Sequence, residues 1–170
     1  VAAYGQIIPE RLLNIPNTIF LNIHASLLPK YRGGSPIHAA IRNGDMFTGV
    51  SIMYMVKKMD AGDILAQERV LIEDSDTAFS MFKKLGTVGS NLLIETIEKL
   101  VQGEIKVRKQ NQHFVSYAPN IKREDEKIDW KSSTFRIDCH IRGYHTWPGT
   151  FSEIHGEKVK IFPGLLSSIK

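Results

Sequence analysis

Two polar residues end an otherwise apolar segment, and they are the first candidates for chemistry. Asn22 and His24 close the run 18–24, and in a strand their side chains point to one face. Asp60 follows a later apolar run, in a loop that contains Gly62. An amide donor, an imidazole and a carboxylate suit acyl transfer, because N–H groups stabilise an oxyanion while the carboxylate orients and charges the imidazole. We predict that Asn22, His24 and Asp60 are catalytic.

Each of these residues also has an ordinary structural interpretation. A histidine at a strand end is often a hydrogen-bonded structural residue, and Asp60 before Gly62 can form an Asx turn. Ser26 adds the third residue type of a nucleophilic triad, but no G-x-S-x-G elbow surrounds it, so a serine hydrolase is disfavoured.

Other reactive residue types show no spacing that indicates a site. Cys139 is predicted to be a small buried side chain rather than a nucleophile. The six histidines form no H-E-x-x-H pattern, and no metal site is indicated. Gly33-Gly34 alone is a weak phosphate-loop signal and is more typical of a turn.

The elements that must position these residues alternate between strands and helices. We expect strands over 18–24, 48–56 and 64–70, a short helix over 36–43 capped by Ser35, and an amphipathic helix from Asp76-Thr77 to Gly103 with Phe79, Phe82, Leu85, Leu92, Leu93, Ile97 and Leu100 on its apolar side. Gly86 and Gly89 weaken that helix, and a close approach to the sheet is one reason for them. The pattern predicts an α/β fold, in which crossovers bring strand ends, and so Asp60 and His24, together.

The composition changes after Gly103. The polar stretch 106–112 has little to bury and is a plausible linker. A second helix is expected over 133–142, closed by Gly143, and then a hairpin in which 150–154 and 158–162 flank His155-Gly156-Glu157. Two strands alone are marginal, so this region is interpreted as the beginning of a β domain.

Composition and charge narrow the class of protein. With 170 residues, 42% apolar and 24% charged, the chain is neither a disordered tail nor a membrane protein, since its longest apolar runs are a few residues and a bilayer span needs roughly 20. One cysteine and no leader pattern favour a cytoplasmic protein, and the opening at Val1 suggests a fragment. The net charge of +4 lies wholly in residues 104–170, which fits a polyanionic partner such as RNA or an ordinary solvated surface.

Two motifs then carry a resemblance to a known family. The stretch NIHASLLPKYRGGSPI at 22–37, followed by MDAGDIL at 59–65, resembles the formyltetrahydrofolate-dependent formyltransferases, with both motifs at the family's separation. The continuation YAPNIK at 117–122, IDW at 128–130 and WPG at 147–149 resembles the family members that act on methionyl-tRNA. The resemblance covers essentially the whole chain and lacks the family's N-terminal part and most of its C-terminal barrel.

The resemblance implies a Rossmann-like parallel-sheet domain and a set of site residues. It implies the C-terminal portion of the catalytic domain at 1–105, a linker at 106–122 and the start of an OB-type domain at 123–170. It assigns Asn22, His24 and Asp60 as catalytic, in agreement with the residues alone. Folate contacts are implied for Ser26, Leu27, Leu28 and Pro29, with 4–13 and 56–60 lining the pocket.

The resemblance also implies the reaction and its partners. The formyl donor is 10-formyltetrahydrofolate, no metal is used, and the acceptor is the α-amine of initiator methionyl-tRNA. No membrane partner is expected, the complete protein is expected to be a monomer, and residues 1–170 alone are expected to have weak activity or none. The rivals are a formyltransferase for amino-sugar nucleotides, a formyltetrahydrofolate hydrolase, and a non-enzymatic RNA-binding module built on residues 104–170.

Overall fold

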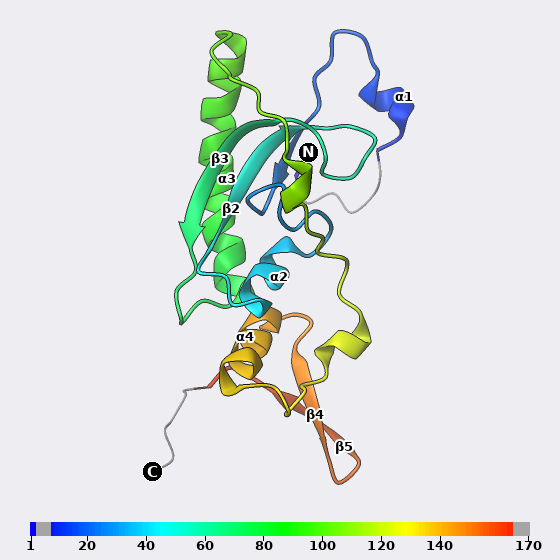
Figure 1. The fold of residues 1–170 in the computed structure, drawn as a ribbon, viewed down its shortest axis with the longest axis vertical. Coiled ribbons are helices and arrows are strands. Elements are labelled where there is room, and N and C mark those ends of the chain that lie inside the picture. The colour runs from blue at the N-terminus through cyan, green and yellow to red at the C-terminus, as the bar shows by residue number, and fades with distance from the viewer. Residues whose placement is uncertain (3–7, 165–170) are drawn as a thin grey trace.

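A computed structural model describes residues 1–2 and 8–164 of the chain (Figure 1). The elements, in chain order, are α1 (Glu10–Leu13), β1 (Leu21–His24), α2 (Pro36–Arg42), β2 (Phe47–Tyr54), β3 (Ile64–Leu71), α3 (Ala78–Val101), two 3₁₀ turns (Gln112–Phe114 and Arg123–Glu126), α4 (Thr134–Tyr144), β4 (Thr150–Ile154) and β5 (Glu157–Ile161). Every helix and strand expected from the sequence is present, although β1 begins at Leu21 rather than Thr18. Within the described residues, no helix combines the length and apolar character that crossing a membrane requires.

The strands β1, β2 and β3 form a three-stranded sheet in that order, and both pairings are antiparallel. Leu21 lies opposite Tyr54, so the end of β2 lies beside the start of β1. A parallel bridge joins Ala2 to Ile23 on the other side of β1. The α/β class is confirmed, but the crossover that we expected between β1 and β2 is wrong, and another route must bring Asp60 to His24.

The helix α3 covers one face of this sheet (Figure 1). Alternation along β1 turns Leu21 and Ile23 toward α3, and therefore turns Asn22 and His24 to the opposite face. The core between helix and sheet is formed by apolar side chains of α2, β2 and α3: Ile37, Ile41, Val50, Ile52, Ala78, Met81 and Leu85. Burial of these side chains on one side of β1 fixes which way its polar residues point.

The start of α3 and its two glycines follow from local contacts. Thr77 and Ser80 form a reciprocal capping box at the first turn. A Cβ at Gly89 would lie 3.1 Å from Ile23 Cγ2, so the helix approaches β1 closely there. A Cβ at Gly86 would meet nothing within 4 Å, so the close approach that we expected at Gly86 is wrong.

The apolar stripe predicted for α3 is only partly right. Leu85 is buried, but Phe79 and Phe82 are 50% and 53% exposed. The inner positions of the first turns are taken by Ala78 and Met81, which turns both phenylalanines to the side of the helix. Ile97 is likewise exposed, while Leu92 and Leu93 pack against the core as expected.

The segment after α3 returns along the sheet face that α3 leaves uncovered (Figure 1). Arg108 exchanges two backbone hydrogen bonds with Ile64 at the start of β3, at 2.8 and 2.9 Å. Farther along, Ser116 O accepts from Arg32 N–H at 2.9 Å, and Ala118 N–H donates to Arg32 O at 2.8 Å. The stretch predicted as a linker is therefore docked on the loops that follow β1 and β2.

The last elements pack against α2 at one end of the molecule. The Arg42 guanidinium donates to the Tyr144 hydroxyl at 2.6 Å, which ties α2 to α4. The helix α4 ends at Tyr144, so the prediction that Gly143 ends it is wrong by one residue. A Cβ at Gly143 would lie 2.8 Å from Arg42 Cγ, so α4 approaches α2 closely there. The burial predicted for Cys139 is confirmed, and β4 and β5 form the expected hairpin.

Candidate active site

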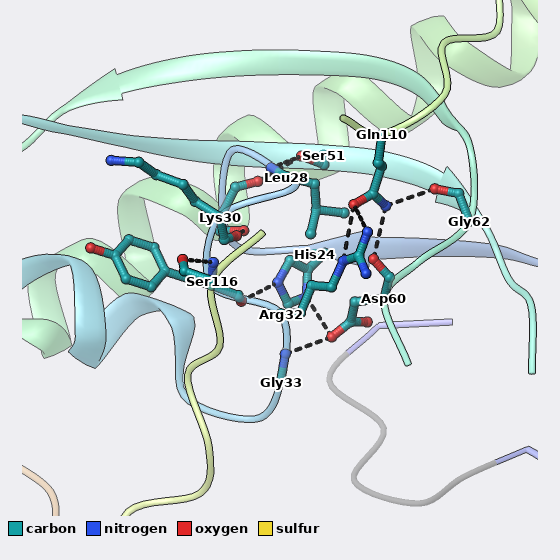
Figure 2. Close-up of polar contacts among 12 residues, drawn as sticks. His24, Leu28, Lys30, Arg32, Gly33, Ser51, Asp60, Gly62, Gln110 and Ser116 are labelled. Carbon is teal, nitrogen blue, oxygen red and sulfur yellow. Dashed lines mark hydrogen bonds and ion pairs between the residues drawn. The ribbon is translucent and has the colours of Figure 1, made fainter. Parts of the chain in front are cut away.

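His24 and Asp60 meet on the sheet face opposite α3. His24 Nδ1 lies 3.7 Å from Asp60 Oδ2, and both side chains are largely buried (Figure 2). His24 Nε2 lies 2.9 Å from the carbonyl oxygen of Tyr31. Because a carbonyl can only accept, Nε2 must carry a proton, and Nδ1 is the ring nitrogen left to exchange a proton with a ligand or with Asp60.

The Asp60 loop reaches His24 through contacts that are distant in sequence. Asp60 has a φ of 48°, a left-handed conformation that is uncommon for a residue with a side chain. Its Oδ2 accepts the backbone N–H of Gly33 at 2.8 Å. A Cβ at Gly62 would lie 1.8 Å from Tyr54 O, so only glycine lets the loop turn this closely on the end of β2. These contacts, rather than the crossover that we expected, bring Asp60 to His24.

Asn22 joins the pair through the geometry of β1. It is two residues from His24, pairs with Met53 in the ladder and is partly exposed. Its side chain is therefore on the face of His24 and Asp60 and accessible from outside. An amide there can donate to an oxygen that lies beside the imidazole.

The loop after β1 is held by two polar residues of the neighbouring strands. Ser51 Oγ donates to Ser26 O at 2.6 Å and accepts from Leu28 N–H at 3.1 Å. Gln67 Nε2 donates to Leu28 O and to Ser51 Oγ, at 2.9 and 2.8 Å. Ser26 Oγ itself donates to Lys30 O at 2.6 Å. The loop is thus built from side-chain to backbone hydrogen bonds, and Ser26 is committed to its structure instead of facing His24 as a nucleophile.

The implied folate contacts stay a prediction. Ser26 and Leu28 are fully buried and hydrogen-bonded inside the loop, whereas Leu27 and Pro29 are half-buried and keep accessible surface. Of the segments expected to line the pocket, 56–60 is described and mostly exposed, and residues 4–7 of 4–13 lie outside the described part of the chain.

Sequence reasoning missed two buried residues, Arg32 and Gln110. The Arg32 side chain is fully buried, and its Nε and Nη2 donate to Gln110 Oε1 at 3.1 and 2.7 Å. Its Nη1 has no hydrogen-bond partner among the described residues. Gln110 is 7% exposed, so the expectation that the linker has little to bury is wrong there. A polar linker composition gave no signal for this contact, which depends on residues 78 positions apart.

The tyrosine that receives the His24 bond is itself buried. Burial raises the pKa of Tyr31 to about 12, and the nearby Asp45 carboxylate, which accepts its hydroxyl proton at 2.8 Å, acts in the same direction. Tyr31 therefore stays neutral at ordinary pH. Among the described residues, no group of three or more His, Cys, Asp or Glu side chains could hold a metal ion.

Two family models match this chain. Residues 1–97 match the model described as formyl transferase, and residues 120–168 match the C-terminal domain of formyl transferase. The chain belongs to the formyl transferase family. The resemblance of its two motifs to that family is confirmed, and the formyltransferase fold with it.

Curated relatives and solved structures agree with this membership. Methionyl-tRNA formyltransferases of Bacillus thuringiensis (strain Al Hakam) and Bacillus anthracis (strain CDC 684 / NRRL 3495) are 48% identical over 163 residues, covering 96% of this chain and 52% of theirs. The chain therefore spans about half the length of these relatives.

Among solved structures, a 4-N formyltransferase from Francisella tularensis gives a TM-score of 0.83 at 23% identity over 98% of this chain and 70% of that chain. An N-formyltransferase from Helicobacter canadensis, in complex with folinic acid and dTDP-3-aminofucose, gives 0.71 at 26% identity over 83% and 53%. The Francisella tularensis structure shows that this chain and that protein share a fold.

Proposed function

We propose that the protein transfers the formyl group of 10-formyltetrahydrofolate to the α-amine of methionine carried by initiator tRNA, a reaction of translation initiation. The observation that carries the proposal is the approach of His24 Nδ1 to Asp60 Oδ2, on the face shared with Asn22, in a chain 48% identical to methionyl-tRNA formyltransferases. Initiator methionyl-tRNA and the folate are the proposed partners, and no metal takes part in the proposed chemistry.

The chemistry assigns one task to each side chain. The neutral amine attacks the formyl carbon, forming a C–N bond and an oxyanion, which the Asn22 amide and the Nδ1–H of protonated His24 stabilise. His24 must act through Nδ1 because its Nε2 proton is directed at Tyr31 O. Asp60 holds that proton on the imidazole and accepts one from the attacking amine. The bond to folate N10 then breaks, and N10 receives a proton from His24 or a bound water.

The folate is proposed to contact the loop Ser26, Leu27, Leu28 and Pro29. The half-buried side chains of Leu27 and Pro29 suit the apolar faces of a flat heterocycle. A contact through the Ser26 hydroxyl would compete with its 2.6 Å bond to Lys30 O. Leu27→Ala is therefore expected to raise the folate KM more than Ser26→Ala does.

The test is formyl transfer by the full-length protein with three acceptors in parallel. With charged initiator tRNA, turnover is expected, and His24→Ala should lower kcat by about 10²-fold or more, the scale of general acid–base and oxyanion contributions. A dTDP-linked amino sugar as the preferred acceptor would support the sugar-nucleotide rival. Formate release without any amine would indicate a hydrolase, and near wild-type turnover in His24→Ala would overturn the site.

A further inference from the structure

We propose that Gln110 is a positioning residue of the active site, which fixes the Asp60 loop against His24. The segment that follows α3 would then complete the catalytic site in addition to joining two parts of the chain. This inference rests on the proposed function for its kinetic readout, and on geometry alone for the rest.

The side chain of Gln110 makes every hydrogen bond that an amide can make. Its Nε2 donates to Asp60 O at 2.8 Å and to Gly62 O at 2.7 Å, and its Oε1 accepts both Arg32 bonds (Figure 2). The orientation of the amide is fixed by chemistry, since a guanidinium has no acceptor and a carbonyl has no donor. Gln110 therefore holds the carbonyl groups of Asp60 and Gly62, and Asp60 is the residue whose side chain faces His24.

The backbone on both sides of Gln110 is itself anchored. Arg108, two residues before it, pairs with Ile64 at the start of β3. After it, Ser116 Oγ accepts from Tyr31 N–H at 2.9 Å, and Tyr117 bridges with Arg32. The glutamine is thus presented from a segment bound to the loops after β1 and β2.

The same segment also reaches the other loop of the site. Arg108 Nη2 donates to Gln67 Oε1 at 3.1 Å, which leaves Gln67 Nε2 to hold Leu28 O and Ser51 Oγ. Two glutamines therefore fix the two loops, and the segment 108–118 contacts both. A local rearrangement of that segment would reach Asp60 through Gln110.

A carboxylate in place of the amide separates the two halves of this contact. In Gln110→Glu, the new carboxylate still accepts from Arg32, now as an ion pair, but it has no proton for the carbonyls of Asp60 and Gly62. The contact with Arg32 is therefore kept while both bonds to the Asp60 loop are lost, so an effect on the rate reports the loss of those two bonds.

The experiment compares Gln110→Glu with Gln102→Glu in the full-length protein, by single-turnover formyl transfer to charged initiator tRNA. Gln102 is exposed at the end of α3 and controls for the added charge. We expect Gln110→Glu to lower the rate about 10-fold to 10²-fold with KM changed less than about threefold. Gln102→Glu should match wild type in both rate and KM.

A second readout keeps the inference testable whatever the acceptor. The ring resonances of His24 in NMR spectra should move in Gln110→Glu and stay in Gln102→Glu. If Gln110→Glu does not fold, the double variant Arg32→Met with Gln110→Met removes both partners and leaves the two carbonyls without donors, and the same shift is expected.

Unmoved His24 resonances and a wild-type rate in Gln110→Glu would overturn the positioning role while leaving the proposed function intact. Failure of the wild-type protein to formylate methionyl-tRNA, with His24 still shifted, would instead overturn the proposed function alone.

Discussion

Asp60 and His155 are two of the residues whose backbone lies in the left-handed region, and the turns that contain them are stabilised in different ways. His155 has a φ of 51° and shares the two-residue turn between β4 and β5 with Gly156, whose φ is 83°. Its support comes from the adjoining strands, which pair from Ile154 and Glu157 outward. Asp60, with a φ of 48°, is supported by Gly33 and Gln110, which are 27 and 50 residues away.

The difference is the one expected if the Asp60 turn belongs to the proposed active site. The hairpin turn is exposed, and the apolar residues Ile154, Val159 and Phe162 of the hairpin region are exposed as well. The Asp60 turn is bonded to a network of buried polar groups that includes Gln110 and Arg32. An uncommon backbone held by distant partners is typical of a functional site, whereas a local turn satisfies the needs of its own two strands.

The largest expected effect is that of the Asp60 carboxylate. Asp60→Ala should lower kcat for formyl transfer by about 10²-fold, because the imidazole then loses its acid–base partner. The matched control is Glu157→Ala, which removes a carboxylate beside the hairpin turn and should leave kcat within about twofold. Steady-state kinetics of the full-length protein measure both. Similar losses in the two variants would remove the distinction between the turns.

The next effect concerns Ser51, which holds the loop after β1 by two hydrogen bonds. Ser51→Ala should lower the free energy of unfolding by about 3 kcal/mol, since Ser26 O and Leu28 N–H lose their buried partner. Denaturant unfolding checks this, with the exposed Ser90→Ala, expected within about 0.5 kcal/mol, as control. If Ser51→Ala were as stable as the control, the loop would not depend on that hydroxyl.

A smaller effect is expected from pH at the junction of α2 and α4. Burial lowers the pKa of both His38 and His140 below 6.5, so the folded state binds fewer protons than the unfolded state below that pH. The melting temperature should therefore fall as pH drops from 7.5 to 5.5. His38→Phe, which keeps an aromatic ring beside Phe82 and Tyr144, should flatten that dependence. An equally steep curve in the variant would exclude His38 as a contributor.

The smallest effect belongs to the hairpin turn. Gly156→Ala forces a side chain into the left-handed region and should destabilise the β4–β5 ladder by about 1 kcal/mol, with kcat unchanged. Amide exchange along the ladder measures the loss. Gly86→Ala is the control with an effect of opposite sign. A Cβ there meets nothing within 4 Å, and alanine favours a helix, so this variant should stabilise the chain by about 0.5 to 1 kcal/mol. A loss of kcat in Gly156→Ala would show that the hairpin affects the proposed active site.

The same contrast explains what could be predicted from sequence. The hairpin, the α3 cap and the faces of β1 follow from local signals, namely a turn glycine, Thr77 and alternation. The pairing of His24 with Asp60 was predicted from residue types and a family resemblance, but through a wrong crossover, because strand direction is set by tertiary contacts. Gln110 was missed because a buried glutamine and a solvated one look alike in a sequence.

The most direct test of the account is a double-mutant cycle on His24 and Asp60, in single-turnover formyl transfer by the full-length protein. If the two side chains act as one unit, the double variant His24→Ala with Asp60→Ala should be slower than the slower single variant by less than about threefold. A double variant whose loss equals the product of the two single losses, about 10⁴-fold, would show that imidazole and carboxylate act independently and would contradict the account.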